Sequence, residues 1–162
     1  MAKVIAICGK ICGGKTHYSN KIKETEKAVV LSCDELTRYL FDNNLGDKHD
    51  EMSKKIWEYL LKKSIDIVNT GTNFILDWGF WSKKDREFIK AYFIENKVFV
   101  EWHYINIDDN SWQKNITERN NKVLKDKSSF DYYIDEGLKN KFLSKWQEPN
   151  KCDIDVWYNL VR

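Results

Sequence analysis

The sequence is short of residues that interrupt regular structure and of long apolar runs. Pro149 is the only proline among 162 residues, and no stretch rich in serine, glycine or proline marks a linker. We therefore expect a single compact domain over residues 1–162. The apolar run at 4–8 is far too short for a signal sequence or a membrane span, so no membrane partner is expected.

Patterns for metal binding and disulfides are also missing. Four cysteines stand at positions 8, 12, 33 and 152, without a C-x-x-C pair and without a histidine at a zinc-like spacing. Reduced thiols and a cytoplasmic location are the simplest interpretation. The net charge of only +2 argues against a nucleic-acid coat protein, although a local basic patch would still permit a nucleic-acid partner. Both a monomer and a homodimer are compatible with the sequence.

What the sequence does contain is an alternation of short apolar runs and helical segments. Apolar runs predict strands at 3–8, 28–32, 73–76 and 98–107, whereas 153–161 fits either a strand or an irregular tail. Helical spacing and capping signals predict helices at 15–26, 35–43, 50–69, after the capping box of Ser82 and Asp85, at 111–120 with Asn110 as the cap, and at 133–142. The polar segments 46–49 and 121–129 are expected to interrupt this pattern. Such alternation is typical of an α/β fold built from parallel βαβ units with helices on both faces.

A glycine-rich motif separates the first predicted strand from the first predicted helix. It reads Gly9-Lys10-Ile11-Cys12-Gly13-Gly14-Lys15-Thr16 and matches G-x-x-x-x-G-K-[ST] at every position. Glycines allow a tight turn whose N–H groups face phosphate oxygens, and the helix adds its positive end. Lys15 can then reach the β- and γ-phosphates of ATP, and Thr16 can hold Mg²⁺. The alternative, a turn with a chance lysine, leaves unexplained why the motif follows a strand and opens a helix.

Two carboxylates fall at the carboxyl ends of predicted strands, where open α/β sheets bind ligands. Asp34 follows the second strand and Asp77 the third. Phosphoryl transfer needs a metal and a group that accepts the proton of the attacking hydroxyl. Asp34 suits the role of base and Asp77 that of contact with a metal or its bound water, although the two roles could be exchanged. The structural alternatives are helix capping for Asp34 and backbone amide contacts for Asp77.

Several other side chains near these positions have two interpretations. Arg119 precedes three lysines, which predicts a lid at about 119–135 that closes cations over the triphosphate; a solvated helix end is the alternative. Cys12 either tolerates the turn as a small residue or is oxidised readily in a positive loop. Trp78 and Trp81 follow Asp77 and either stack on a ligand or, as is more common, pack in the core. The three lysines are Lys122, Lys125 and Lys127.

Together these motifs resemble a known family. The matching segments are the motif at 9–16, 31–36, 74–81 with Arg86, Arg119-Asn120 and 146–149, which span nearly the whole chain. They are similar to small bacterial predicted kinases of the P-loop "AAA domain" type, akin to zeta toxin, chloramphenicol phosphotransferase and the kinase half of polynucleotide kinase. The resemblance implies a three-layer sandwich around a five-stranded parallel sheet of order 2-3-1-4-5, with a helical lid from about Arg119. It also implies Asp34 as base, and Lys15 with Thr16 for ATP and Mg²⁺.

The sequence departs from that family at two places, one in the glycine-rich motif and one after Asp34. Cys12 and Gly13 stand where relatives often have glycine and serine, and Arg38 lies four residues after Asp34 rather than three. Three functions fit: a kinase that moves the γ-phosphoryl of ATP to a hydroxyl of a small molecule, a polynucleotide 5′-hydroxyl kinase, and a non-catalytic ATP-binding switch. An N-K-x-D motif for guanine is missing, which favours ATP. The acceptor itself does not follow from the resemblance.

Overall fold

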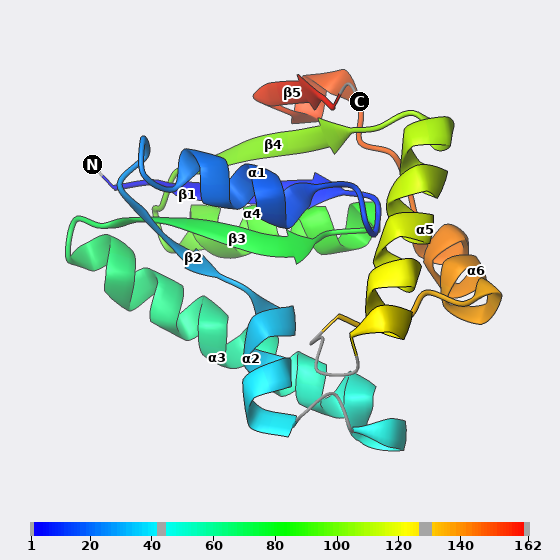
Figure 1. The fold of residues 1–162 in the computed structure, drawn as a ribbon. Helices are drawn as coiled ribbons and strands as arrows, with labels where there is room; N and C mark the ends of the chain where they lie inside the picture. Colours follow the sequence, from blue (N-terminus) through cyan, green and yellow to red (C-terminus); the bar gives the residue numbers. More distant parts are fainter. Residues whose placement is uncertain (1, 42–44, 127–130, 161–162) are drawn as a thin grey trace.

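The computed structural model describes residues 2–41, 45–126 and 131–160. A sheet of five parallel strands runs through its middle in the order β2-β3-β1-β4-β5 (Figure 1). Both the parallel sheet and the order implied by the family resemblance are confirmed, and the doubtful segment at 153–161 contains a strand. The strands are β1 Val4–Gly9, β2 Ala28–Leu31, β3 Asn73–Gly79, β4 Val100–Asn106 and β5 Val156–Asn159.

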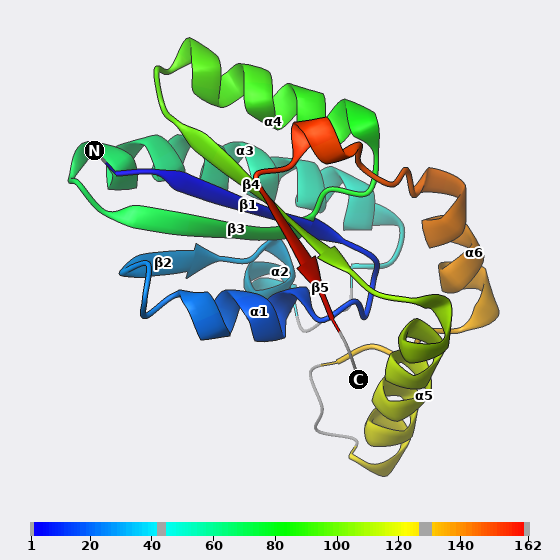
Figure 2. The same ribbon diagram turned by 90° about the horizontal axis from the view of Figure 1, so that it is seen from above.

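Helices cover both faces of the sheet, and two more lie beyond its carboxyl edge. In Figure 2, α3 and α4 lie on one face and α1 on the other, while α5 and α6 stand beside the ends towards which the strands point. Two short 3₁₀ turns, Gly46–Lys48 and Lys151–Asp153, complete the regular structure of the described residues. The helices are α1 Lys15–Ile22, α2 Cys33–Phe41, α3 His49–Asn69, α4 Lys83–Glu95, α5 Asp109–Lys125 and α6 Glu136–Lys145.

Strand β1 is buried on both faces, which explains its unbroken apolar sequence. Val4 and Ala6 pack towards α3 and α4, whereas Ile5 and Ile7 pack towards Tyr18 of α1. The central strand is thus packed on both faces, and the glycine-rich loop begins at the end of this well-packed strand.

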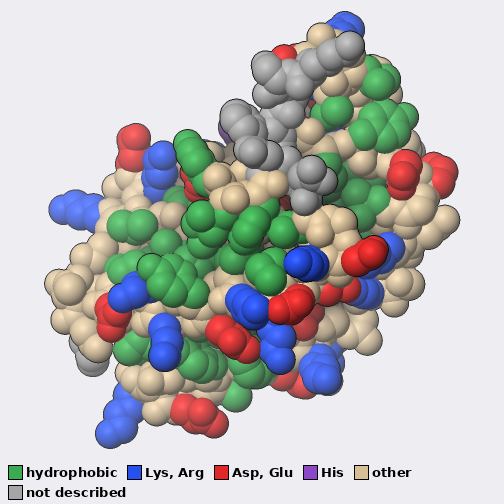
Figure 3. Space-filling model, turned by 90° about the horizontal axis from the view of Figure 1, so that it is seen from below, with side chains coloured by type: hydrophobic (Ala, Val, Ile, Leu, Met, Phe, Trp, Pro, Cys, Tyr) green, Lys and Arg blue, Asp and Glu red, His purple; other side chains and the backbone are tan. Residues whose placement is uncertain are grey.

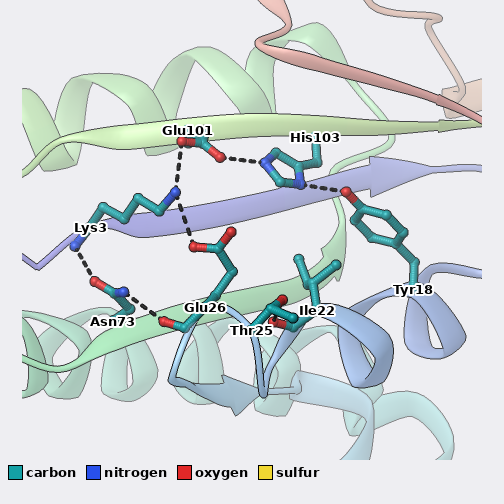
Figure 4. A network of polar contacts seen from close by, with 8 residues as sticks. All are labelled: Lys3, Tyr18, Ile22, Thr25, Glu26, Asn73, Glu101 and His103. Atoms are coloured by element: carbon teal, nitrogen blue, oxygen red, sulfur yellow. Dashed lines mark hydrogen bonds and ion pairs between the residues drawn. The ribbon is translucent and has the colours of Figure 1, made fainter.

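A chain of polar contacts fastens α1 to the sheet (Figure 4). The hydroxyl of Tyr18 lies 2.9 Å from Nδ1 of His103 on β4, and Nε2 of His103 lies 2.7 Å from Glu101. Glu101 also pairs with Lys3 at 2.9 Å, and Lys3 pairs with Glu26 at 3.1 Å. Tyr18 and His103 are both buried, so this chain holds the helix that begins at the glycine-rich loop.

Several predicted boundaries were wrong. Asp108, not Asn110, caps α5, because its side chain accepts from the N–H of Ser111, and the helix continues to Lys125 through the segment expected to interrupt it. The expected loop at 46–49 is a 3₁₀ turn that leads directly into α3, α1 ends at Ile22, and α6 begins only at Glu136. The capping box of α4 is confirmed. The predicted segments that include 42–43, 127–129 and 161 extend outside the described residues.

The surface keeps some apolar side chains uncovered. Figure 3 shows the underside of the view in Figure 1, where apolar side chains gather in the middle and charged groups surround them. Val29 of the edge strand β2 and Tyr39 and Leu40 of α2 are among the exposed large apolar residues. No helix within the described ranges is long and apolar enough to cross a membrane.

Candidate functional site

The glycine-rich motif forms a tight loop between β1 and the first turn of α1. The N–H of Gly13 donates to the carbonyl of Lys10 at 2.9 Å, and a Cβ at Gly13 would lie only 2.7 Å from that oxygen. Gly14 has a φ of +88°, a backbone conformation that residues with side chains rarely adopt. Gly14 is also the N-cap of α1, so no capping side chain bonds to the amides at the start of the helix. The loop therefore presents a free helix N-terminus, which suits an anion.

Two residues of α5 support this loop from outside. The indole nitrogen of Trp112 donates to the carbonyl of Ile11 at 2.6 Å, and Nδ2 of Asn115 donates to the carbonyl of Cys12 at 2.8 Å. Oδ1 of Asn115 is buried and has no hydrogen-bond partner among the described residues. Neither residue was identified from the sequence; their three-residue spacing on one helix face was the only signal.

Lys15 lies at the centre of the site. Its ammonium donates to the carbonyls of Lys10 at 2.9 Å and Gly9 at 3.3 Å, so it closes the loop from inside. Burial lowers the pKa of Lys15, and the carboxylates of Asp77 and Asp34 act in the opposite direction. The side chain of Lys10 points elsewhere, because its ammonium pairs with Asp109 at 2.7 Å.

Thr16 and Asp77 form a pair of oxygen groups beside Lys15. The hydroxyl of Thr16 donates to Oδ2 of Asp77 at 2.7 Å. The pairing of β1 with β3 shifts by one residue just after Asp77, so this carboxylate ends the regular part of the strand. Burial raises the pKa of Asp77, while Lys15 and Thr16 lower it.

These two oxygens fit a hard cation such as Mg²⁺, which binds through few protein ligands together with substrate phosphates. Within the described residues, no group of three or more His, Cys, Asp or Glu side chains could hold a metal by itself. A cation at Thr16 and Asp77 would therefore need oxygens from a bound ligand as well.

Asp34 lies in the first turn of α2 and borders the same cavity as Lys15 and Asp77. Its interpretation as the helix cap is wrong, because the hydroxyl of Ser32 accepts from the N–H of Glu35 at 3.2 Å. The Asp34 side chain is exposed, in contrast to that of Asp77. The two carboxylates thus differ in their environment: one is buried against a threonine, and the other faces open space.

The predicted cations occupy different places. Arg119 lies within α5 rather than at its end and borders the cavity, with its guanidinium carbon 5.8 Å from the centre of the Tyr132 ring. Arg38 donates from Nε to the carbonyl of Asp34 at 3.1 Å. Arg86 is buried and donates to the carbonyl of Phe80, so it serves the core.

The lid expected at 119–135 is helical up to Lys125, and Lys127 lies outside the described residues. Lys122 borders the cavity and pairs with Asp131 at 3.3 Å, whereas Lys125 is not part of the lining. Closure of this segment as a lid stays a prediction.

The two tryptophans after Asp77 pack against other aromatic rings. Trp78 lies 4.9 Å from Trp57 between ring centres and donates from its indole nitrogen to the carbonyl of Leu31. Trp81 meets Phe142 edge to face at 5.0 Å. Packing therefore accounts for both rings, although both also border the cavity.

A single cavity of about 1460 Å³ brings most of the predicted site together. It is lined by residues 11–16 of the loop, by Asp34 and Asp77 at the strand ends, and by Arg119 of α5. Gly9 and Lys10 belong to the loop but not to this lining. The volume exceeds the roughly 300–1000 Å³ of ordinary small-ligand sites, which leaves room for a nucleotide and a second substrate.

A phosphate-type loop at the end of β1, a lysine that closes it and a threonine bonded to the aspartate of the adjacent strand define a P-loop NTPase of kinase-like fold. The chain belongs to the AAA domain family, whose sequence model matches residues 4–133. None of the curated proteins matches the sequence significantly.

Solved structures share this fold at low sequence identity. A protein of Chloroflexus aurantiacus, provisionally assigned as a kinase, aligns with a TM-score of 0.71 at 14% identity, over 98% of this chain and 87% of that one. A gluconokinase of Sinorhizobium meliloti gives 0.64 at 11% identity, over 99% and 83%. The APS kinase of Mycobacterium tuberculosis, solved with AMPPNP and APS, gives 0.63 at 13% identity, over 99% and 90%.

Proposed function

We propose that the protein is an ATP-dependent kinase that transfers the γ-phosphoryl group to a hydroxyl group of a small molecule. The observation that carries this proposal is one cavity shared by the phosphate loop, the Thr16–Asp77 pair and Asp34. A protein that only binds nucleotide would need the loop and the Thr16–Asp77 pair but no further carboxylate beside them. The carboxylate of Asp34 in the lining of the same cavity would add the group that phosphoryl transfer requires at the attacking hydroxyl.

The nucleotide side of the cavity is assigned to the loop and its neighbours. The amides of the loop and the ammonium of Lys15 would bind the β- and γ-phosphates, and Arg119 would neutralise charge from the side of α5. Thr16 and Asp77 would hold Mg²⁺, which would supply positive charge to neutralise the phosphate oxygens. Burial of Asp77 against Thr16 supports this assignment over a role as base.

The acceptor side is assigned to α2. Asp34 would accept the proton of the attacking hydroxyl, and its open position towards the cavity allows a substrate to approach it. A polynucleotide with a free 5′-hydroxyl is the second candidate acceptor. It is favoured by Tyr39, which is 82% exposed, and by Lys141 and Lys145, because an exposed ring and cations that line one cavity suit a single strand.

A substrate screen tests the proposal. The purified protein is incubated with Mg²⁺ and γ-labelled ATP against pooled nucleosides, sugars, aminoglycosides and 5′-hydroxyl oligonucleotides. We expect a labelled small molecule that Lys15→Ala abolishes, that Asp34→Asn lowers by roughly 10²–10⁴-fold with ATP binding retained, and that the surface variant Asp66→Asn leaves unchanged.

The other outcomes discriminate between the alternatives. Label confined to oligonucleotides would establish the second candidate. Lys15-dependent ATP binding without any labelled product would instead identify a non-catalytic switch, and the kinase proposal would be wrong. An Asp34→Asn variant that transfers at the wild-type rate would remove Asp34 from the role of base.

A further inference from the structure

The segment 131–134 after α5, here called the strap, is fixed across the cavity. Asn120 of α5 makes two hydrogen bonds with Ile134, one to its carbonyl at 2.8 Å and one from its N–H at 2.7 Å. The side chain of Ile134 is buried. At the other end, Asp131 pairs with Lys122 of α5 at 3.3 Å and with Arg38 of α2 at 3.9 Å. The strap is therefore tied to both walls of the cavity.

Tyr132 lies in the middle of the strap and borders the cavity. Its ring stands 5.8 Å from the guanidinium carbon of Arg119. Burial raises the pKa of Tyr132 to about 12. The carboxylate of Asp34 also raises this pKa, whereas the guanidinium groups of Arg119 and Arg38 lower it. Tyr132 therefore lines the same cavity as the phosphate loop and Asp34 of α2, where the proposed function places the γ-phosphoryl group and its acceptor.

The hydroxyl of Tyr132 differs from the other hydroxyls of the cavity in its hydrogen bonding and exposure. Those of Thr16, Ser32 and Thr37 each make a hydrogen bond within the protein. Tyr39 is 82% exposed at the rim. With respect to residues 2–41, 45–126 and 131–160, the hydroxyl of Tyr132 makes no hydrogen bond. Tyr132 is half-buried, so a hydroxyl in the cavity that no protein group binds can form a hydrogen bond to a ligand or take part in chemistry.

We infer that Tyr132 is itself a phosphoryl acceptor, so that the protein phosphorylates its own strap when ATP is bound; this inference rests on the proposed kinase activity. Oη of Tyr132 attacks the γ-phosphorus of ATP, the bond from that phosphorus to the β–γ bridging oxygen breaks, and ADP leaves. The phenol proton passes to the carboxylate of Asp34 and then to water. A hydroxyl on a strap that is tied to the cavity walls reacts as an intramolecular group, which favours it over dissolved acceptors at low concentration.

Phosphorylation of Tyr132 would change the charge and the free space of the cavity. A phosphate on Tyr132 would add a charge of about −1.5 to −2 in a cavity that Arg38 and Arg119 also line, and guanidinium groups bind phosphate through paired hydrogen bonds. The same phosphate would repel the carboxylate of Asp131, which is next to it in the chain. It would also fill space that a free acceptor needs, so the modified protein is expected to transfer phosphoryl groups to other acceptors more slowly.

The test uses the full chain with Mg²⁺ and γ-labelled ATP and no added acceptor, followed by mass spectrometry of the labelled peptides. We expect up to one phosphate per chain, on Tyr132, at a first-order rate that does not depend on protein concentration. Tyr132→Phe keeps the ring beside Arg119 but removes the nucleophile, and it should lower labelling at least about tenfold. Tyr133→Phe, which changes the adjacent exposed tyrosine, should label like the wild type.

ATP affinity and thermal unfolding of each variant are measured alongside, so that a misfolded protein is recognised. The inference is overturned if Tyr132→Phe labels like the wild type, if the label lies on another residue, or if the rate rises with protein concentration. An unlabelled strap in a preparation that phosphorylates a free acceptor would overturn this inference and leave the proposed function intact. ATP binding with neither protein nor free acceptor labelled would overturn both.

Discussion

Replacing Asp77 by asparagine should move stability and catalysis in opposite directions. The carboxylate of Asp77 is buried, and its raised pKa shows that the folded protein disfavours its charge despite Lys15 and Thr16. The asparagine side chain would keep the size of the aspartate and an oxygen that can accept from Thr16 while it removes the buried charge. We expect the ligand-free variant to be about 0.5–2 kcal/mol more stable, which corresponds to a rise in Tm of roughly 1–8 °C for a chain of this length.

The same substitution should nearly abolish phosphoryl transfer. In the proposed site, Asp77 is the charged protein ligand of Mg²⁺, and the loss of one such electrostatic contact typically lowers kcat by roughly 10²–10³-fold, or about 2.7–4 kcal/mol. The assays are differential scanning calorimetry without nucleotide and transfer of labelled phosphate at saturating Mg²⁺. Asp66→Asn, a change in an exposed carboxylate of α3, provides the matched control.

Stability of the wild type should also depend on pH through this group. Because the pKa of Asp77 is raised in the folded state above its ordinary value of 3.8, the unfolded chain releases its proton first as the pH rises. The contribution of Asp77 to the free energy of unfolding is therefore fully present below about pH 3.8 and is lost as the pH rises through the pKa of the folded state. The asparagine variant should lack this pH dependence. An Asp77→Asn protein that is less stable than the wild type at pH 7 and still transfers at the wild-type rate would refute the reasoning.

Three further substitutions probe the loop and its supports. Gly13→Ala places a Cβ 2.7 Å from the carbonyl of Lys10, so ATP affinity, measured by calorimetric titration, should fall by at least about tenfold as the loop is forced open. Asn115→Ala removes one hydrogen bond to the loop and should weaken ATP binding by roughly fivefold, or about 1 kcal/mol, without changing the rate at saturation. Tyr18→Phe leaves a nitrogen of His103 without its buried partner and should cost about 1–3 kcal/mol in urea unfolding; an unchanged midpoint would show that the contact does not support the fold.

The central part of the fold follows from local sequence patterns. The apolar residues at 3–8 predict a buried strand, and the structure has it at Val4–Gly9. The motif that follows contains glycines where a side chain would clash, at Gly13, or strain the backbone, at Gly14. The sheet order, in contrast, came from a family resemblance, since the composition of a strand does not say which strand lies beside it.

Long-range contacts explain what sequence reasoning did not find. Asp108 rather than Asn110 caps α5, because both residue types cap well and only the path of the chain selects one. The supports of the loop, Trp112 and Asn115, come from a helix about 100 residues further along the chain. Tyr18 and His103 are 85 residues apart in the sequence, so no local pattern predicts their contact. Residues of this kind are visible only once the fold has brought them together.

The hydrogen bond from Trp112 to the loop has a practical consequence for experiments. An indole whose N–H donates to the carbonyl of Ile11 changes its emission when that carbonyl moves, and Lys10 lies 4.9 Å above the same ring. Ligands that rearrange the loop should therefore alter the intrinsic fluorescence of the protein without any attached dye. The other six tryptophans add a background, which a Trp112→Phe variant would separate from the signal. The molecule thus contains an optical probe of its own loop.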